Sequence, residues 1–186
     1  MSVRNAARPM RGLAGLCALL LLTAACARAP EMPQRLSDIQ GIDPDRKALA
    51  LREVKSLQAK GQRVWCVPFA RNASGIDIRG NANTWWSQAK GLYDRGSAPV
   101  IGAVMAFSAS RSNPMGHVAV VSDVISEREV RVDHANWQRN KVSLGMKVVD
   151  VSDRNDWTAV RLESQPNALG GVYPVSGFIY PAHHAQ

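Results

Sequence analysis

One cysteine and two histidines occupy positions from which they could carry out nucleophilic chemistry. Cys66 precedes Pro68, a residue that fits a helix only in its first turn, so Cys66 should begin a helix over 66–74. The N–H groups and the macrodipole at a helix start stabilise a thiolate, and the same N–H groups can hold the oxyanion of an acyl transfer. Cys66 is therefore a candidate nucleophile, and the alternative is a buried structural cysteine.

The histidines are expected at the ends of two neighbouring strands. His117 begins an apolar strand over 117–125, and period-two alternation in the strand 129–137 places His134 and Asn136 on its buried face. If the two strands pair antiparallel through the turn between them, the start of the first lies opposite the end of the second. The base, His117, would then lie close to two polar groups that could orient it, His134 and Asn136. The helix would supply the nucleophile.

A metal site is the rival use of Cys66, His117 and His134. Their spacing matches no common zinc pattern, and the sequence shows no clear fourth ligand. The sequence therefore predicts neither a metal nor any other cofactor.

The elements that must position these residues are helices followed by strands. Apolar spacing predicts a helix from Asp45 to Lys60, and shorter helices are expected over 66–74 and 83–90. The β-rich runs after Pro99 cover 100–107, 117–125, 129–137, 141–151, 157–162 and 177–180. This order predicts an α+β fold in which N-terminal helices pack on an antiparallel sheet.

The first 25 residues have the pattern of an export signal. A basic start without acidic residues precedes an apolar run at 16–22, which is shorter than the ~20 residues of a membrane span. The segment Leu22–Cys26 resembles a bacterial lipobox, which implies lipidation of Cys26 and a periplasmic protein anchored to the envelope membrane. Ordinary cleavage a few residues later, releasing a soluble protein, is the alternative.

The remaining chain divides into a tether at 26–44, a folded domain at 45–181 and a tail at 182–186. With 46% hydrophobic and 20% charged residues the chain is not disordered, and 3 cysteines exclude a disulfide-rich scaffold. Removal of 1–25 deletes three arginines and no acids, so the formal net charge falls from +8 to +5. The remaining cations are scattered, so no nucleic-acid partner is expected.

Several segments together resemble the CHAP family of cysteine- and histidine-dependent amidohydrolases and peptidases. The similarity extends over roughly Trp65 to Tyr180. The matching segments, in the order of the family, are Cys66–Arg71, Gly80–Ala82 with Trp85-Trp86, Pro99–Val104, Gly116–Val121 and His134–Trp137.

The resemblance implies a papain-like fold and cleavage of peptidoglycan amide bonds by Cys66 and His117. The third catalytic residue of the family is usually a glutamate, and His134 occupies that position here, as histidine does in the related NlpC-like peptidases. Asn136 matches a family position and is the other candidate for orienting His117. Asp133 has the charge of the missing glutamate but lies on the opposite face of its strand.

The expected function is therefore peptidoglycan hydrolysis, with peptidoglycan as partner and a membrane contact through lipidated Cys26. The place of the family's usual oxyanion donor is taken by Trp65, and Gln62 is only a weak substitute. Two alternatives stay open: a catalytically silent murein-binding or scaffolding lipoprotein, which the missing glutamate favours, and an amidase acting on another small amide.

Overall fold

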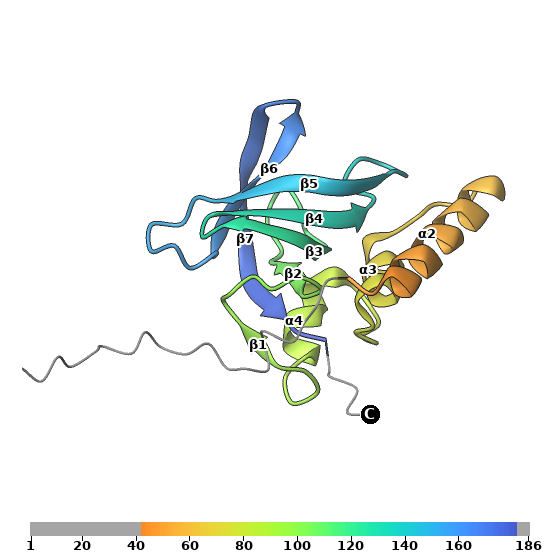
Figure 1. Ribbon diagram of the computed structural model, residues 1–186, viewed down its shortest axis with the longest axis horizontal. Helices are drawn as coiled ribbons and strands as arrows, with labels where there is room; N and C mark the ends of the chain where they lie inside the picture. Colours follow the sequence, from red (N-terminus) through yellow and green to blue (C-terminus); the bar gives the residue numbers. More distant parts are fainter. Residues whose placement is uncertain (1–41, 182–186) are drawn as a thin grey trace, which may run out of the picture. The chain divides into compact units, whose positions relative to one another are not determined.

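The computed structural model describes residues 42–181, which form helices and an antiparallel sheet (Figure 1). The export signal predicted at 1–25, the lipidation site Cys26, the tether up to residue 41 and the tail at 182–186 lie outside the described residues. None of the helices within 42–181 has the length and apolarity that a membrane-spanning helix requires.

The helical segments come first along the described chain, as predicted. They are α2 (Pro44–Ala59), α3 (Cys66–Ser74), the 3₁₀ turn η1 (Ala82–Thr84) and α4 (Trp85–Gln88). Asp43 caps α2 by accepting hydrogen bonds from the N–H groups of Asp45 and Arg46. Gly75, in the left-handed conformation at φ 78°, ends α3.

The strands follow and pair antiparallel throughout. They are β1 (Arg95–Gly96), β2 (Val104–Phe107), β3 (His117–Ser126), β4 (Glu129–Ala135), β5 (Val142–Asp150), β6 (Ala159–Gln165) and β7 (Ala168–Ile179). Their order in the sheet is β1-β7-β2-β3-β4-β5-β6, and β6 also pairs with β7.

The pairing of β6 with β7 corrects the expectation of a simple sheet. The α+β class is confirmed, but the sheet closes into a six-stranded barrel, with β1 attached to β7. Closure follows from the length of β7, whose residues 168–174 pair with β6 while residues 175–179 pair with β2. The run predicted at 177–180 is thus only the end of a longer strand.

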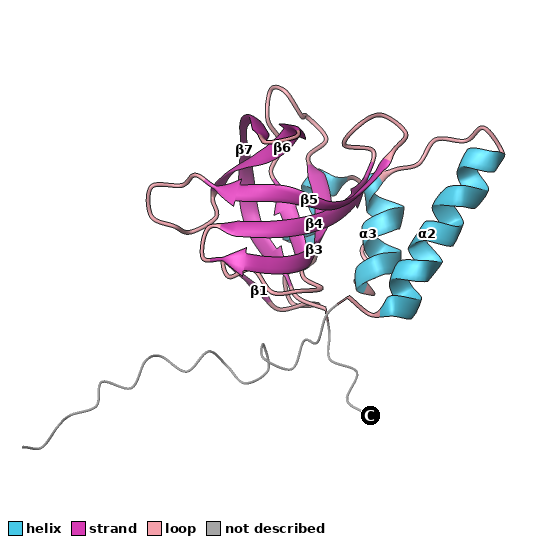
Figure 2. Cartoon of the chain, turned by 45° about the horizontal axis from the view of Figure 1, so that its top comes forward, coloured by secondary structure: helices cyan, strands magenta, loops and turns pink. Residues whose placement is uncertain are grey.

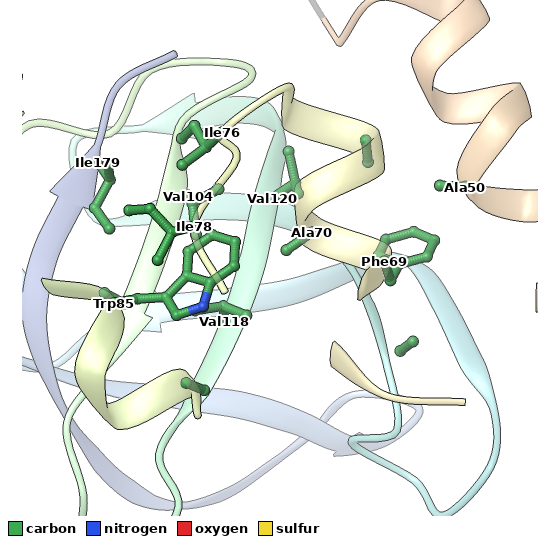
Figure 3. Close-up of a cluster of buried hydrophobic side chains, with 14 of the residues drawn as sticks. Ala50, Phe69, Ala70, Ile76, Ile78, Trp85, Val104, Val118, Val120 and Ile179 are labelled. Carbon is green, nitrogen blue, oxygen red and sulfur yellow. The ribbon is translucent and has the colours of Figure 1, made fainter. Parts of the chain in front are cut away.

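Side chains on the two faces of the strands belong to two different buried clusters. Val118 and Val120 of β3 pack with α3 and α4, whereas Ala119 and Val121 belong to a second cluster with β4, β6 and β7. Figure 3 shows the first cluster, in which Trp85 lies among side chains from β2, β3 and β7. In Figure 2, α2 and α3 lie side by side at one end of the strands. This packing places the start of α3 beside β3.

Candidate active site

Cys66 is the first residue of α3, as the sequence predicts. Trp65 precedes it in extended conformation, at φ −136° and ψ 152°, and Pro68 fits in the first turn. Burial raises the pKa of the Cys66 thiol, and hydrogen bonds from the backbone N–H groups of Val118, Val67 and Cys66 oppose this effect. Since Val118 directly follows His117, the contact brings the thiol to the start of β3.

Gly116 sets the position of His117 at the start of β3. Its backbone has φ 65°, and a Cβ there would lie 2.8 Å from the carbonyl oxygen of Phe107 and 2.9 Å from the backbone nitrogen of Asn83. The Asn83 N–H also donates to the carbonyl of Met115 at 2.8 Å. Only glycine allows this close approach, so the turn before His117 is fixed against η1.

His117 and His134 lie together, as the predicted pairing of their strands requires. The Nε2 of His117 and the Nδ1 of His134 share a hydrogen bond of 3.0 Å, and both rings are buried, at 4% and 0% exposure. The register of β3 and β4, in which Val120 is opposite Asp133, brings the two histidines to the same end of the strand pair. This hydrogen bond to His134 restricts the orientation of the His117 ring.

Aromatic rings enclose the histidine pair. Trp137 stacks on His134, with ring centroids 5.7 Å apart, and forms a T-shaped pair with His117, with centroids 5.0 Å apart. Phe107 lies 5.7 Å from His117. This enclosure removes water from both imidazoles and disfavours their charged forms.

The electrostatic consequence is an uncharged histidine pair. Burial, followed by repulsion from His134, lowers the pKa of His117 well below its ordinary value of 6.5. Burial also lowers the pKa of His134 to about 4, although the nearby carboxylate of Asp133 acts in the opposite direction. Both rings are consequently neutral at neutral pH, and the resting thiol is protonated.

A pocket of about 610 Å³, here called the thiol pocket, opens beside these residues. Cys66, His117 and Asn136 all line it, whereas His134 lies behind His117. The other lining residues are Arg63, Trp65, Val67, Pro68, Gly80, Asn81, Ala82, Asn113, Met115 and Gly116. A substrate in this pocket would meet both the sulfur and the imidazole.

Asn136 lines the pocket but does not make the expected contact that would orient His117. Its Oδ1 accepts hydrogen bonds from the Asn140 N–H at 2.9 Å and from Nε of Arg63 at 3.4 Å. No hydrogen bond joins it to His117 within 42–181. The reason lies in the backbone, because Asn136 has φ 63° and begins the turn into β5, so it has left the alternation of β4.

Asp133 and Gln62 lie away from the thiol pocket. The buried carboxylate of Asp133 pairs with Nζ of Lys47 at 2.7 Å and accepts a hydrogen bond from the Gly145 N–H at 2.7 Å. This agrees with the opposite face expected for Asp133. Gln62 is exposed and does not line the pocket, so it is not placed as an oxyanion donor.

One residue of the pocket, Arg63, carried no signal in the sequence. Arg63 is a single exposed arginine outside any motif, and only the folded chain reveals that it lines the pocket. No group of three or more His, Cys, Asp or Glu side chains within the described part of the chain is arranged to hold a metal ion.

The chain matches a model of a known domain family. No curated protein matches the chain. The model of the CHAP domain matches residues 58–136, from the end of α2 to the turn after β4. The matched segment contains Cys66, His117, His134 and Asn136, and it is the segment that forms the thiol pocket. Residues 58–136 of this chain therefore belong to the CHAP domain family.

Proposed function

We propose that the protein is a peptidoglycan hydrolase that cleaves an amide bond of the stem peptide or cross-link through the thiol of Cys66. One observation carries the proposal: a helix-start thiol and an imidazole oriented by a second histidine line the same pocket. A nucleophile from a helix, a base from a strand and an orienting group from the next strand form a papain-like arrangement. Membership of the CHAP domain family supports the choice of peptidoglycan.

The tautomers of the histidine pair determine whether His117 can serve as a base. Only one of the two facing nitrogens can donate, and a base requires that Nε2–H of His117 donates to Nδ1 of His134. Nδ1 of His117 then keeps a lone pair for the thiol. His134 carries its proton on Nε2, a buried atom with no hydrogen-bond partner within 42–181. His134 thus acts as a positioning residue.

The reaction starts from a neutral thiol and a neutral imidazole. Nδ1 of His117 accepts the thiol proton while the sulfur of Cys66 forms a bond to the carbonyl carbon of the amide. The negative charge that develops on the carbonyl oxygen is stabilised by N–H groups in the first turn of α3. One such donor typically contributes ~10²–10³ in rate.

The tetrahedral intermediate then breaks down, and the side chains of the site return to their starting protonation states. The C–N bond breaks, the amine takes the proton from His117, and a thioester remains on Cys66. Water attacks the thioester carbonyl while His117 accepts one of its protons. The C–S bond breaks, the sulfur regains that proton, and a carboxylic acid leaves. The net reaction is hydrolysis of one amide by one water.

Digestion of purified murein sacculi followed by mass spectrometry tests this function. We expect the wild-type protein to release fragments with new amino and carboxyl termini, whose masses identify the bond, and Cys66→Ala to release none. Cys66→Ser, which keeps the size of the side chain, serves as the matched variant, and thermal unfolding checks that both variants fold. Clearance of murein by Cys66→Ala at the wild-type rate would refute the proposal.

A catalytically silent murein-binding lipoprotein is the second candidate. It is favoured by the raised pKa of the Cys66 thiol and by the histidine at the position of the family's usual glutamate. Comparison of murein binding with release of murein termini separates the two. Release of termini that is lost in His117→Ala supports the hydrolase, whereas murein binding by the wild type without release of termini supports the silent binder.

We further propose that the protein is exported and that Cys26 is lipidated, which would hold it on the periplasmic face of an envelope membrane. The basic, apolar and small-residue pattern of 1–26 supports this. Mass spectrometry of the mature N-terminus should find a lipid on Cys26. Membrane association should be lost in Cys26→Ala and kept in the control Cys17→Ala. An unmodified N-terminus beginning after residue 26 would exclude the anchor.

A further inference from the structure

Arg63 is the charged residue of the thiol pocket. Among the described residues that line the pocket, it is the single Lys, Arg, Asp or Glu side chain, and the other polar groups are amides, the thiol and a neutral imidazole. The pocket therefore carries an uncompensated positive charge. Such a pocket favours a ligand that brings a negative charge of its own.

The guanidinium of Arg63 is held in place by neighbours on two sides. Its central carbon lies 4.0 Å from the centroid of the Trp65 ring, and its Nε donates to Oδ1 of Asn136 at 3.4 Å. Asn136 is itself fixed by the N–H of Asn140 at 2.9 Å. An arginine restrained in this way loses little further freedom when it binds a ligand.

The turn that restrains Arg63 is also tied to the segment that carries it. Oδ1 of Asn140 accepts a hydrogen bond from the Val64 N–H at 2.9 Å, and its carbonyl accepts one from Nε2 of Gln58 at 2.9 Å. The residue after Arg63 and the end of α2 are thus fastened to the turn between β4 and β5. This places the arginine on a defined side of the pocket rather than on a loose surface chain.

The terminal nitrogens of Arg63 remain available to a ligand. Within residues 42–181 the hydrogen bond of Arg63 uses Nε, and neither Nη1 nor Nη2 takes part in a hydrogen bond or an ion pair. Two parallel N–H donors in a planar fork match the geometry of a carboxylate. Phosphate would also fit a fork, but carboxylates are the anions that a peptide substrate supplies.

We propose that Arg63 binds a free carboxylate of the substrate and thereby selects peptides that carry this group close to the bond attacked by Cys66. The inference rests on the proposed function for the identity of the ligand as a murein stem peptide. It adds a substrate class, an anionic stem peptide, and a specificity-determining residue that contacts it.

Binding measured by titration calorimetry tests the inference without requiring turnover. The protein is the full chain with Cys66→Ala, and the probes are synthetic murein stem peptides in which each free carboxylate in turn is replaced by its carboxamide. We expect one of these replacements to weaken binding about 10–100-fold, the loss that follows when a charge-assisted hydrogen bond is removed. Arg63→Gln should weaken binding of the unmodified peptide by a similar factor.

The combination of both changes gives the decisive comparison. If Arg63 meets that carboxylate, Arg63→Gln bound to the carboxamide should be no weaker than either single change, because the same contact is removed twice. Arg63→Lys should be intermediate, since it keeps the charge but lacks the fork. Arg52→Gln is the matched control, because Arg52 is exposed on α2 and does not line the pocket.

Several outcomes would overturn the inference: no stem peptide binds, Arg63→Gln binds as wild type does, or its effect adds fully to that of every carboxamide. The proposed hydrolysis is judged separately by the sacculus digestion. A chain that discriminates carboxylate from carboxamide but releases no murein termini would keep the Arg63 assignment and reject the hydrolase.

Discussion

At the scale of the residue, the pairing of two neutral histidines distinguishes this site from one in which a carboxylate orients the base. A carboxylate favours the imidazolium form of its partner, whereas His134 does not. Burial and His134 lower the pKa of His117, so its imidazole stays unprotonated and able to accept a proton below pH 6.5. The site is therefore suited to proton transfer from a neutral thiol.

The pH dependence of hydrolysis follows from this pairing. We expect the acid limb of kcat/KM against stem peptide to lie below pH 6.5, because His117 becomes protonated only there. His134→Glu should move this limb to higher pH, since a carboxylate raises the pKa of His117. His134→Gln, which removes the repulsion of His134 but brings no negative charge, is the control and should move the limb much less than His134→Glu. A wild-type limb above 6.5 would contradict the neutral pair.

The stability of the folded chain should also depend on His134. Its pKa is about 4 when folded against 6.5 for a free imidazole, so the unfolded chain binds the proton first as the pH falls. Stability is consequently lost between about pH 6.5 and about pH 4, by about 3 kcal/mol from this residue.

Urea unfolding at about pH 7 and about pH 4.5 measures this loss. His134→Gln cannot take up the proton, so its free energy of unfolding should fall less than that of the wild type over the same interval. An equal fall in both proteins would show that His134 is not buried in its neutral form.

At the scale of the element, α2 is joined to β4 by the contact of Lys47 with Asp133. The carboxylate is 1% exposed and the lysine 35% exposed, with 2.7 Å between Nζ and Oδ2. Because α2 also packs against α3, this ion pair helps to hold the helix that carries Cys66. Asp133 thus supports the site from the face opposite to His117.

Removal of the lysine should destabilise the protein. We expect Lys47→Met to lower the free energy of unfolding by about 2 kcal/mol, because a buried carboxylate loses its partner while the exposed part of Lys47 limits the loss. Adding Asp133→Asn should restore part of the stability. Lys55→Met, an exposed lysine of the same helix, is the control in urea unfolding. Equal effects of Lys47→Met and Lys55→Met would rule out the proposed link.

The elements around the site were the ones that the sequence predicted best. The helix over 66–74 has those bounds in the structure, because Pro68 and Gly75 mark its start and end in the local sequence. The alternation of β3 and β4 likewise predicted the meeting of His117 and His134. Asn136 lines the same pocket as His117, but its own left-handed backbone interrupts the alternation, and within 42–181 it makes no hydrogen bond to His117. A periodic pattern does not reveal such a turn residue.

The elements far from the site were predicted less well, for physical reasons. Residues 168–176 were not predicted as a strand, because Gly170, Gly171 and Pro174 are depleted in strand interiors. They are tolerated here because barrel pairing with β6 compensates for them. Residues 100–103 were predicted as strand but form a turn that includes Gly102 at φ 87°.

At the scale of the whole described molecule, barrel closure makes the site depend on strands that lie outside the family match. The match ends at residue 136, yet β2 pairs with β7, and the cluster beneath the histidines includes Val148, Trp157 and Phe178. The part of the chain recognisable as CHAP therefore lacks three strands that complete its barrel.

A fragment ending at residue 136 tests this dependence. We expect residues 42–136 alone to show no cooperative unfolding by circular dichroism, because β2 loses a partner strand and one cluster loses much of its apolar surface. Residues 42–181 should unfold in one cooperative transition. A cooperative transition in the shorter fragment would show that closure is not required for folding.

The burial of Cys66 affects how readily the protein is oxidised. Peroxides and disulfides attack the thiolate far faster than the thiol, and burial keeps this sulfur in its protonated form. An ion-paired thiolate would react with such oxidants while no substrate is bound. In the proposed mechanism the sulfur is deprotonated only when a carbonyl is in place, which would protect it from this oxidation but slow the first step.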